Sequence, residues 1–307
     1  MIRFVPHNPP ALWGGRKLES VFGRSLPAGP IGESWELVEL PERHTLAHGG
    51  SHDGRPLGEL WRAGVLGGSK RGPFPFMLKW IDAADTLSVQ VHPDEAACDK
   101  MKSGRPKTEA WYVVQKDGDA TLLMGHHAGL DAKTLEQAAK SNTLGKWLYE
   151  VKPKVGDMFL LKAGTVHAIG RGNLLLEVQQ ASDTTYRIND WGRLGQDGQP
   201  RELHLDKAAA CIAYDRVGPV VAERKRVNGP CFVMEPLPAD SQVGARGLRV
   251  LVADHGEVTL RGQQGDLRLA HGDVVIAEPA DGELTLVGGS AVLLTEPGPQ
   301  GAESRRP

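Results

Sequence analysis

The chain contains little cysteine, which limits the kinds of site that it can build. Its three cysteines, Cys98, Cys211 and Cys231, are odd in number and widely spaced along 307 residues, so they form no disulfide framework, metal motif or redox motif. We expect each of them to be a buried small hydrophobe. So little cysteine also fits a protein from a reducing compartment.

Net charge and long apolar runs are equally scarce. The net charge of −2 offers neither the basic surface that binds nucleic acid nor a charged face for a membrane. No apolar stretch approaches the length of a membrane span, and the start of the chain, MIRFVPHNPPALWGG, lacks the apolar core of a signal peptide. We therefore expect a cytoplasmic protein without nucleic-acid or membrane partners, either a monomer or a homodimer.

Glycine and proline, by contrast, are abundant. With 38 Gly and 21 Pro, the chain suits many short strands joined by turns and disfavours a helical bundle. A turn–strand pattern, GDMFLL at 156–161, recurs as GDVVIA at 272–277. We predict a mainly β protein with a catalytic unit over residues 1–214 and a smaller, metal-free barrel over 215–307, in which His255 and His271 are turn residues.

Helical composition is confined to a few segments of the first unit. The pattern predicts short helices at 57–65, 131–139 and 205–214, of which the second is the main helical excursion from the barrel. Residues 95–108 are polar and are interpreted as a loop between two strands.

The stretch from 86 to 114 carries the first candidate metal ligands. Leu87, Val89 and Val91 alternate with polar residues, so Gln90 and His92 leave the other face of the same strand. After the polar loop, a second strand at 109–114 begins with a carboxylate, Glu109. Amide, imidazole and carboxylate groups that converge from neighbouring strands are suitable ligands for a divalent metal.

A further ligand follows the strand at 158–161. A second glycine turn comes after this strand and ends in His167, whose side chain could point back into the mouth of the barrel. A single histidine is more often a surface or core residue than a ligand, and the chain has 11. The combination of the four side chains nevertheless predicts a metal site formed by Gln90, His92, Glu109 and His167.

Two further charged residues lie within strand-like runs. Lys79 interrupts the apolar run 74–83, and its ammonium group either faces a cavity or carboxylate or reaches solvent at a strand edge. Glu177 shares a strand face with Gln179, where it either lines the barrel and bonds to a neighbour or contacts a ligand. The sequence leaves both pairs of alternatives open.

With these motifs, the chain resembles the short bacterial form of class I, zinc-dependent mannose-6-phosphate isomerases, a family of cupin barrels. The matching stretches occur in the order and spacing of that family and span most of residues 1–215. They are WGG at 13–15, GESWE at 32–36, LSVQVHPDE at 87–95, KTEAWYVV at 107–114, GTVHAIG at 164–170 and LEVQQASDTTYRINDWGR at 176–193. The C-terminal part is similar only in its barrel-like pattern, which implies a cupin-type jelly roll followed by a degenerate second cupin barrel.

The resemblance implies that one Zn²⁺ is held by the four predicted ligands, that Arg187 is catalytic, and that Lys107 lines the pocket. It also implies interconversion of mannose 6-phosphate and fructose 6-phosphate through an enediol or enediolate. One departure is Pro106, where the family usually has glycine. Because proline fixes φ, we expect a stiffer loop before Lys107.

Several roles in such a reaction stay open in the sequence. Lys79 and Lys107 are candidates for the anionic pocket, and Arg187 could stabilise the enediolate because its guanidinium stays charged. Lys79, Glu177 and Asp183 are the candidate substrate-binding residues. The base that removes the C2 proton could be Glu177, Asp183, Lys107 or a zinc-bound water.

Three alternative functions use the same residues. Two histidines and a carboxylate also form the site of non-haem iron oxygenases, although a glutamine ligand and a cationic pocket argue against that reading. A cupin-type glucose-6-phosphate isomerase would share the chemistry but not the long matching segments. A non-catalytic module that binds sugar phosphates would have little need for an open metal site beside an arginine.

Overall fold

The first β unit is built from two facing antiparallel sheets. The computed structural model describes residues 1–68, 72–195 and 198–298. One sheet has the order β11 (Leu148–Val151), β10 (Leu122–His126), β13 (His167–Ile169), β8 (Val89–Val91) and β15 (Tyr186–Asn189). The other has the order β12 (Met158–Leu161), β9 (Glu109–Lys116), β14 (Asn173–Gln180), β7 (Phe76–Asp82) and β3 (Glu33–Leu37). This arrangement is the two-sheet barrel that we predicted.

The interior between the two sheets is apolar over part of its length. Trp111 and Val113 of β9 point inward because they alternate with outward-facing residues, and they meet Met124 and Ile169 from the opposite sheet. Glu109 belongs to the same inward set of β9, two residues before Trp111. The end of the interior where Glu109 lies therefore adjoins a packed apolar core. This core restricts the side chains next to it to fixed positions.

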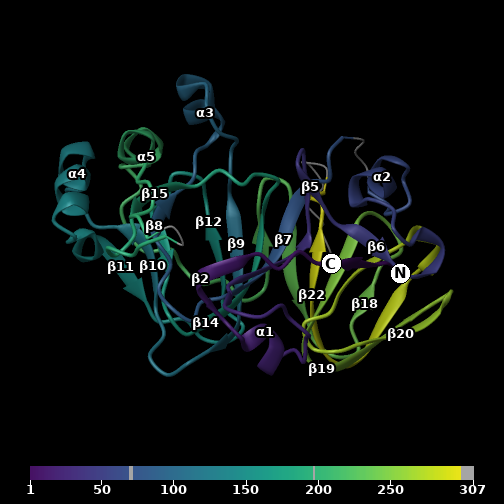
Figure 1. The fold of residues 1–307 in the computed structure, drawn as a ribbon. Helices are drawn as coiled ribbons and strands as arrows, with labels where there is room; N and C mark the ends of the chain where they lie inside the picture. Colours follow the sequence, from purple (N-terminus) through teal and green to yellow (C-terminus); the bar gives the residue numbers. More distant parts are fainter. Residues whose placement is uncertain (69–71, 196–197, 299–307) are drawn as a thin grey trace, which may run out of the picture.

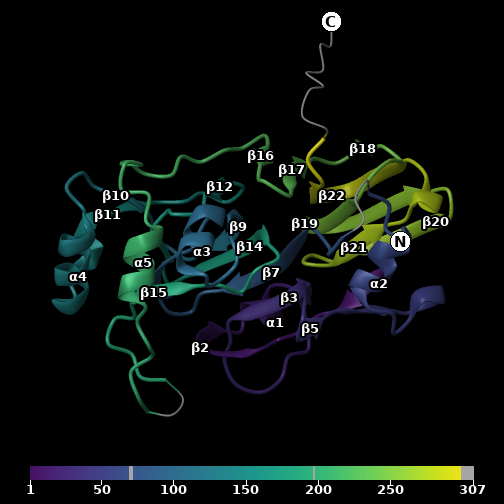
Figure 2. The same ribbon diagram turned by 90° about the horizontal axis from the view of Figure 1, so that it is seen from above.

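Each outer face of the first barrel is covered by a different partner (Figures 1 and 2). Helices α4 (Ala132–Lys140) and α5 (Leu205–Cys211) cover the sheet that contains β8, where Leu135 and Ala208 pack with Val89 and Val91. The second β unit covers the sheet that contains β7. The first barrel thus lies between helices and a second barrel, with its interior shielded on both sides.

The second unit is a sheet that curls around its own apolar core. Its main path is β16 (Val227–Asn228), β17 (Val233–Leu237), β22 (Leu284–Thr295), β19 (Arg249–Gly262) and β20 (Gly265–Leu269), with β18 (Gln242–Val243) on β22 and β21 (Val274–Ala277) on β19. His271 lies in a turn, as predicted. The prediction for His255 was wrong, because β19 continues through it and the register shifts on either side of it absorb the irregularity.

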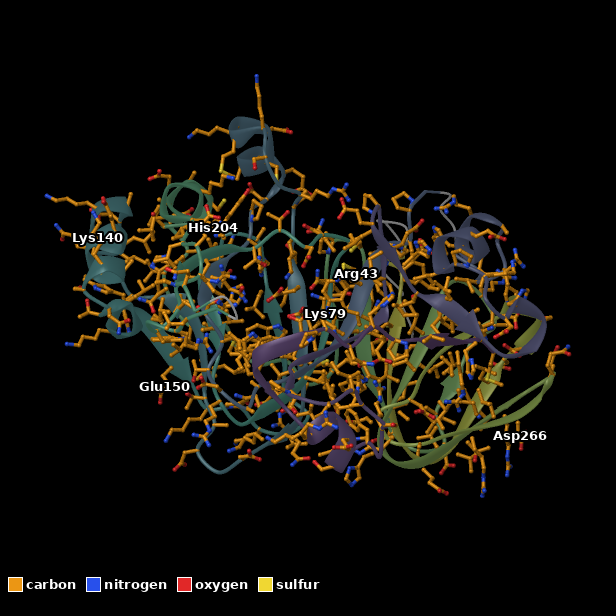
Figure 3. The ribbon with its side chains drawn as sticks, viewed as in Figure 1. Arg43, Lys79, Lys140, Glu150, His204 and Asp266 are labelled. Carbon is orange, nitrogen blue, oxygen red and sulfur yellow. The ribbon has the colours of Figure 1, made fainter. Side chains whose placement is uncertain are left out.

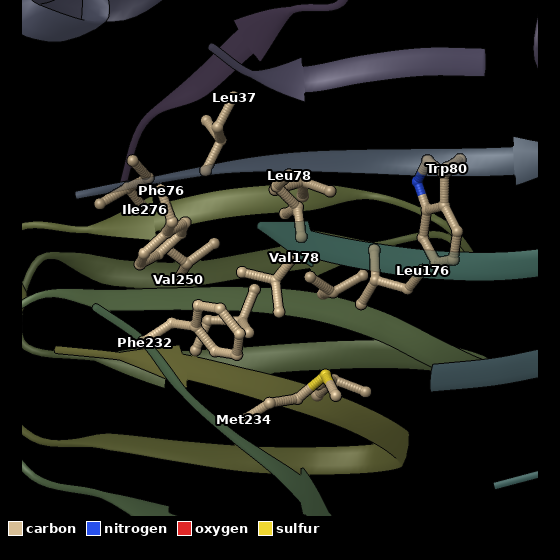
Figure 4. Close-up of a cluster of buried hydrophobic side chains, with 14 of the residues drawn as sticks. Leu37, Phe76, Leu78, Trp80, Leu176, Val178, Phe232, Met234, Val250 and Ile276 are labelled. Atoms are coloured by element: carbon tan, nitrogen blue, oxygen red, sulfur yellow. The ribbon is translucent and has the colours of Figure 1, made fainter. Parts of the chain in front are cut away.

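A shared apolar core joins the two units. Phe76, Leu78 and Val178 of the first barrel pack in one cluster with Phe232 and Ile276 of the second (Figure 4). Residues at the start of the chain also reach the second unit, since Ile2 pairs with Ile276. The boundary at 214/215 stays a prediction, and the shared core shows that the two parts are not separated by an open linker.

The remaining elements are short. They are β1 (Arg3–Val5), β2 (Pro10–Gly15), β4 (Glu39–Leu40), β5 (Arg43–His44), β6 (Leu46–His48), α1 (Lys17–Ser20), α2 (Leu57–Arg62), α3 (Glu95–Met101), and the 3₁₀ turns Gly50–His52, Leu144–Trp147 and Pro279–Asp281. The helices predicted at 57–65, 131–139 and 205–214 are confirmed as α2, α4 and α5. The described part of the chain contains no helix of the length and apolarity that crossing a membrane requires.

Helix α3 corrects the prediction of a loop over residues 95–108. Asp94 caps this helix, because its Oδ1 accepts a hydrogen bond of 2.8 Å from the backbone N–H of Ala97. The helix ends at Lys102, which has a left-handed backbone conformation with φ of 49°. It therefore begins directly after His92 and Pro93, at the end of the strand that carries two predicted ligands.

Candidate functional site

Three of the predicted ligands meet inside the first barrel. His92 follows β8, Glu109 begins β9 and His167 begins β13, and their ligand atoms all lie within 4.8 Å of one another. Glu109 lies between the imidazoles, with Oε2 3.2 Å from His92 Nε2 and Oε1 3.3 Å from His167 Nε2. All three side chains are buried. Two strands of one sheet and one strand of the other therefore position the cluster.

Backbone carbonyls fix which nitrogen of each histidine carries the proton. His92 Nδ1 lies 3.0 Å from the carbonyl oxygen of Thr184, and His167 Nδ1 lies 2.9 Å from that of Thr165. Because a carbonyl oxygen only accepts, each Nδ1 must donate, which leaves Nε2 with a free lone pair. Burial lowers the pKa of His92 to about 3 and also lowers the pKa of His167, so both rings are neutral near pH 7.

The geometry of these donor atoms fits a bound divalent cation. His92 Nε2, His167 Nε2 and Glu109 Oε1 are buried and have no hydrogen-bond partner among the described residues, and Glu109 Oε2 faces only the ammonium group of Lys107 besides the imidazole of His92. Two ligands at about 2.0–2.1 Å from one tetrahedral ion lie roughly 3.3 Å apart, which matches the two N···O distances. Without a cation, lone pairs would face each other at those distances. The cluster is therefore a suitable site for a metal.

Glu109 is held in its charged form by its neighbours. Burial alone would raise the pKa of Glu109, but the ammonium group of Lys107 and the two histidines outweigh burial and lower it well below its usual value. Lys107 Nζ lies 3.1 Å from Glu109 Oε2. Burial alone would lower the pKa of Lys107, but the carboxylates of Glu109, Glu177 and Glu33 together raise it. Both groups are thus charged.

The position of Lys107 is well defined despite Pro106. The backbone N–H of Lys107 donates to the carbonyl oxygen of Pro93, 3.0 Å away, and the side chain is buried with 4% of its surface exposed. The proline therefore does not displace Lys107 from the site. Because Pro106 fixes φ, it reduces the number of conformations that this loop can adopt in the unfolded chain.

Gln90 lies beside the cluster on the same strand as His92. The β8 register pairs Gln90 with His167 on one side and with Arg187 on the other, and Gln90 is half-buried. Its amide therefore sits between a proposed ligand and the predicted catalytic arginine. Its place as a fourth metal ligand stays a prediction.

Lys79 is buried near two carboxylates. It is 3% exposed, its Nζ lies 3.9 Å from Glu177 Oε1 and 4.0 Å from Glu33 Oε2, and it stands 4.5 Å from the ring centroid of Trp35. Figure 3 labels it well inside the molecule, unlike Lys140 and Glu150 at the periphery. Of the two alternatives for Lys79, the one in which it reaches solvent at a strand edge was wrong.

Glu177 lines the barrel and bonds to a neighbour, which is one of the two alternatives that the sequence left open, and its contact with a ligand stays a prediction. Its Oε2 accepts a hydrogen bond of 3.0 Å from Trp111 Nε1, and its side chain also lines the cavity described below. Burial and the nearby Glu109 raise the pKa of Glu177 to about 7. A carboxyl group with a pKa near neutrality can both accept and return a proton.

A cavity of about 330 Å³ adjoins the cluster and brings the predicted site residues together. Its walls include Gln90, Lys107, Lys79, Glu177, Arg187 and Asp183. Asp183 is exposed and also borders two neighbouring hollows, so it lies at the mouth. Arg187 is half-buried, and its Nε has no hydrogen-bond partner in the part of the chain that the structure describes.

Several wall residues were not predicted as site residues, and three of them are large or charged: Trp13, Glu33 and Arg201. Trp13 and Glu33 belong to the WGG and GESWE stretches that carried the family resemblance, so those motifs could have pointed to them. Arg201 lies outside every matching stretch. Only its position in the fold places it beside the other wall residues.

Comparison with known proteins identifies relatives of this chain. The family model for the type I phosphomannose isomerase catalytic domain matches residues 6–113. The chain is 39% identical over 202 residues to a mannose-6-phosphate isomerase of Streptococcus mutans, a match that spans 64% of this chain and 63% of that protein. It is 37% identical over 231 residues to mannose-6-phosphate isomerase ManA of Bacillus subtilis, spanning 73% of this chain and 70% of the relative.

The fold is similar to that of a known relative over nearly the whole chain. The crystal structure of the mannose 6-phosphate isomerase from Bacillus subtilis superposes with a TM-score of 0.86 and 28% sequence identity, covering 95% of this chain and 98% of that one. The predictions of a mainly β fold and of an enzyme of this class are thereby confirmed. The chain belongs to the type I phosphomannose isomerase family of aldose–ketose isomerases.

Proposed function

We propose that this chain interconverts mannose 6-phosphate and fructose 6-phosphate with one Zn²⁺ held by Gln90, His92, Glu109 and His167. The observation that carries the proposal is the buried cluster of His92, Glu109 and His167, whose imidazole Nε2 atoms have no hydrogen-bond partner among the described residues and whose spacings suit one cation, beside a cavity lined by lysine, arginine and carboxylate side chains. When bound, a zinc ion acts as a Lewis acid for the carbonyl and hydroxyl oxygens of the sugar.

Glu177 is the residue that we assign to proton transfer between C1 and C2. Trp111 fixes Glu177 Oε2, while Oε1 faces the cavity side near Lys79. Lys107 is a poor base because its neighbouring carboxylates keep it protonated, and Asp183 is exposed at the mouth of the cavity rather than buried in its wall. Glu177 has the environment that acid–base exchange at neutral pH requires.

Arg187 and Lys107 are assigned to the charge that develops on the sugar oxygens. Both line the cavity and carry positive charge. In a buried cavity, such charges stabilise a developing enediolate more than they would in water.

The assignment of Glu177 predicts a specific pH dependence. As the pH falls through about 7, Glu177 takes up a proton and can no longer accept one, so kcat/KM of the wild type should fall about tenfold per pH unit below that point. Glu177→Gln should lower kcat by roughly 10²- to 10⁴-fold and remove this pH limb.

The matched control for Glu177→Gln is Glu36→Gln. Glu36 is equally buried but pairs with Arg24, with 2.6 Å between Glu36 Oε1 and Arg24 Nη1. The control can lose stability, but it should keep the pH profile of the wild type. A Glu177→Gln variant with an unchanged pH limb would show that another group transfers the proton.

The experiment that tests the function itself is a coupled assay for fructose 6-phosphate from mannose 6-phosphate, run before and after chelation. We expect turnover that chelation abolishes and added zinc restores. Oxygen consumption with iron, without isomerisation, would instead support the oxygenase alternative. Tight binding of mannose 6-phosphate by metal-loaded protein that gives no turnover would support the non-catalytic module.

A further inference from the structure

Arg187 lies on a strand that is paired on one side only. β15 is the last strand of its sheet, and in the part of the chain that the structure describes no strand pairs with its outer edge. On the inner edge Arg187 is paired with Gln90 of β8, but the register shifts between Arg187 and Asn189. The ladder with β8 therefore restrains Arg187 less than a regular pairing would.

The segment 202–204 returns along β15 and binds Arg187 directly. The backbone N–H of His204 donates to the carbonyl oxygen of Arg187 at 2.8 Å, and the backbone N–H of Arg187 donates to His204 Nδ1 at 3.1 Å. Arg187 Nη1 also donates to the carbonyl oxygen of Glu202, 2.9 Å away. One residue thus binds both backbone groups of Arg187, and the residue two positions earlier binds its guanidinium.

The imidazole of His204 does not play the part that is usual at its position. His204 is the N-cap residue of α5, where a side chain commonly accepts a hydrogen bond from the first turn of the helix. The imidazole makes no such bond, and its Nδ1 accepts from β15 instead. Ala208 and Cys211 anchor α5 in the apolar cluster on the same sheet, which fixes the place of His204.

The contact with Arg187 defines the chemical state of the His204 ring. A backbone N–H can only donate, so Nδ1 must carry the lone pair, and the proton of the neutral ring is on Nε2. Nε2 lies 3.8 Å from Glu202 Oε2, and the imidazole side chain is 23% exposed. A proton added to Nδ1 would set two N–H groups against each other and break the contact.

The effect of this contact on the cavity passes through Arg187. The Arg187 side chain lines the cavity, and its Nε is buried without a hydrogen-bond partner among the described residues. Nη1 is already bound by the Glu202 carbonyl, so the Nε edge is available to a ligand. In a preorganised site, a displacement of about 1 Å can lower the rate by about 10²-fold. A residue that fixes the Arg187 backbone can therefore affect catalysis without touching the substrate.

We infer that His204 is a positioning residue for Arg187: its neutral imidazole accepts from the Arg187 backbone and holds the guanidinium where it acts on the sugar. The catalytic part of this inference rests on the proposed function. The contact itself can be tested without any turnover.

The contact should depend on pH through the His204 ring. Burial is the largest cause that lowers the pKa of His204; the carboxylate of Glu202 opposes it, and the cations of Arg187 and Lys207 add to it. The remaining titratable neighbour is Tyr186, whose ring centroid lies 6.0 Å away. Because the pKa is lowered, the ring stays neutral at neutral pH. The acceptor is lost only as the pH falls below the ordinary histidine value of about 6.5.

The test compares His204→Ala with His204→Asn. Asparagine places an amide oxygen near the position of Nδ1 and does not titrate, whereas alanine offers no acceptor. At pH values near 8, His204→Ala should lower kcat for mannose 6-phosphate about 10- to 50-fold and leave KM within about threefold. His204→Asn should keep kcat within about fivefold of wild type. Metal content should stay at one ion per chain, which excludes an effect through Gln90.

The ratio of kcat/KM between wild type and His204→Asn isolates the His204 titration. Protonation of Glu177 affects both proteins and cancels in this ratio. The ratio should be constant above about pH 7 and fall progressively below about pH 6.5, where only the wild type loses its acceptor. A ratio that does not change with pH would contradict the inference. It also decides the matter if His204→Ala does not fold.

Ala208→Gly is the matched control for a loss that is only structural. Glycine weakens the same helix but leaves the His204 acceptor in place, so this variant should melt at a lower temperature with kcat near wild type. A folded His204→Ala protein with wild-type kcat would overturn the inference. An equal loss of kcat in His204→Ala, His204→Asn and Ala208→Gly would do so too, because the loss would then follow helix stability.

Hydrogen exchange of the Arg187 amide, measured by NMR, separates this inference from the proposed function. The amide should exchange at least about tenfold faster in His204→Ala than in wild type, and His204→Asn should restore most of the protection. This result in a wild type without isomerase turnover would contradict the proposed function and support the contact. Turnover by wild type and His204→Ala alike, with equal amide exchange, would do the reverse.

Discussion

His92→Ala is expected to purify without metal and to lose at least about 10³-fold in kcat/KM. His92 Nε2 is a buried atom without a hydrogen-bond partner among the described residues, and alanine cannot replace its lone pair. The remaining Gln90, Glu109 and His167 would have to hold the cation with one protein ligand fewer. Metal content of protein purified without added metal, together with steady-state kinetics, measures both effects. His167→Ala should behave in the same way.

The matched control is His126→Ala. His126 is 2% exposed and lies on β10 of the same sheet, but both of its ring nitrogens face backbone carbonyls, of His127 and Ala213. This variant should lose stability and keep one metal ion per chain. Chelation should lower the melting temperature of the wild type and of His126→Ala but not of His92→Ala, because only a protein that binds the ion is stabilised by it. Full activity of metal-free His92→Ala would end the proposal.

The convergence of His92, Glu109 and His167 could be predicted because local rules determine most of it. Alternation along one strand puts Gln90 and His92 on one face, and the same rule makes Glu109 the first inward residue of β9. Gly164, with φ of +84°, makes the turn after β12 that returns the chain to His167. Each of these features depends on a few neighbouring residues, so one sequence is enough to find them.

Helix α3 was not predicted because the local sequence signal for a helix is weak there. It has seven residues, which is too short for a clear period of 3.6, and its N3 position is Ala97 rather than the glutamate of a capping box. Only Asp94, a good N-cap residue, indicated its start. Charged residues without apolar periodicity then favoured a loop, whereas in the fold Ala97 and Cys98 are buried.

The partners of Lys79 and Arg201 could not be predicted because they depend on register and on chain return. Lys79 faces Glu177 because β7 pairs with β14 in one particular alignment, and nothing within either strand specifies that alignment. Arg201 reaches the cavity because the chain folds back along β15 after Asp190. Such contacts arise only in the assembled barrel, so a single strand or loop of the sequence does not reveal them.

Arg187→Ala is expected to keep the fold and the metal and to lose about 10²- to 10³-fold in kcat. The Arg187 side chain lines the cavity opposite Gln90 on β8, and its Nε has no partner among the described residues, so a donor remains available for the substrate. A charge that acts on the enediolate rather than on the bound sugar should affect kcat more than KM. Kinetics at saturating mannose 6-phosphate, with metal content measured on the same samples, separates this effect from loss of zinc.

Two further variants make the role of Arg187 specific. Arg187→Lys keeps a positive charge without the planar fork, so it should recover only part of the lost kcat. Arg193→Ala removes a guanidinium six residues further along the chain that borders another hollow, and it should leave kcat near the wild-type value. If Arg187→Ala raised KM and left kcat unchanged, the side chain would hold the sugar equally in the ground state and the transition state. Stabilisation of the enediolate would then have to come from Lys107 and the bound cation.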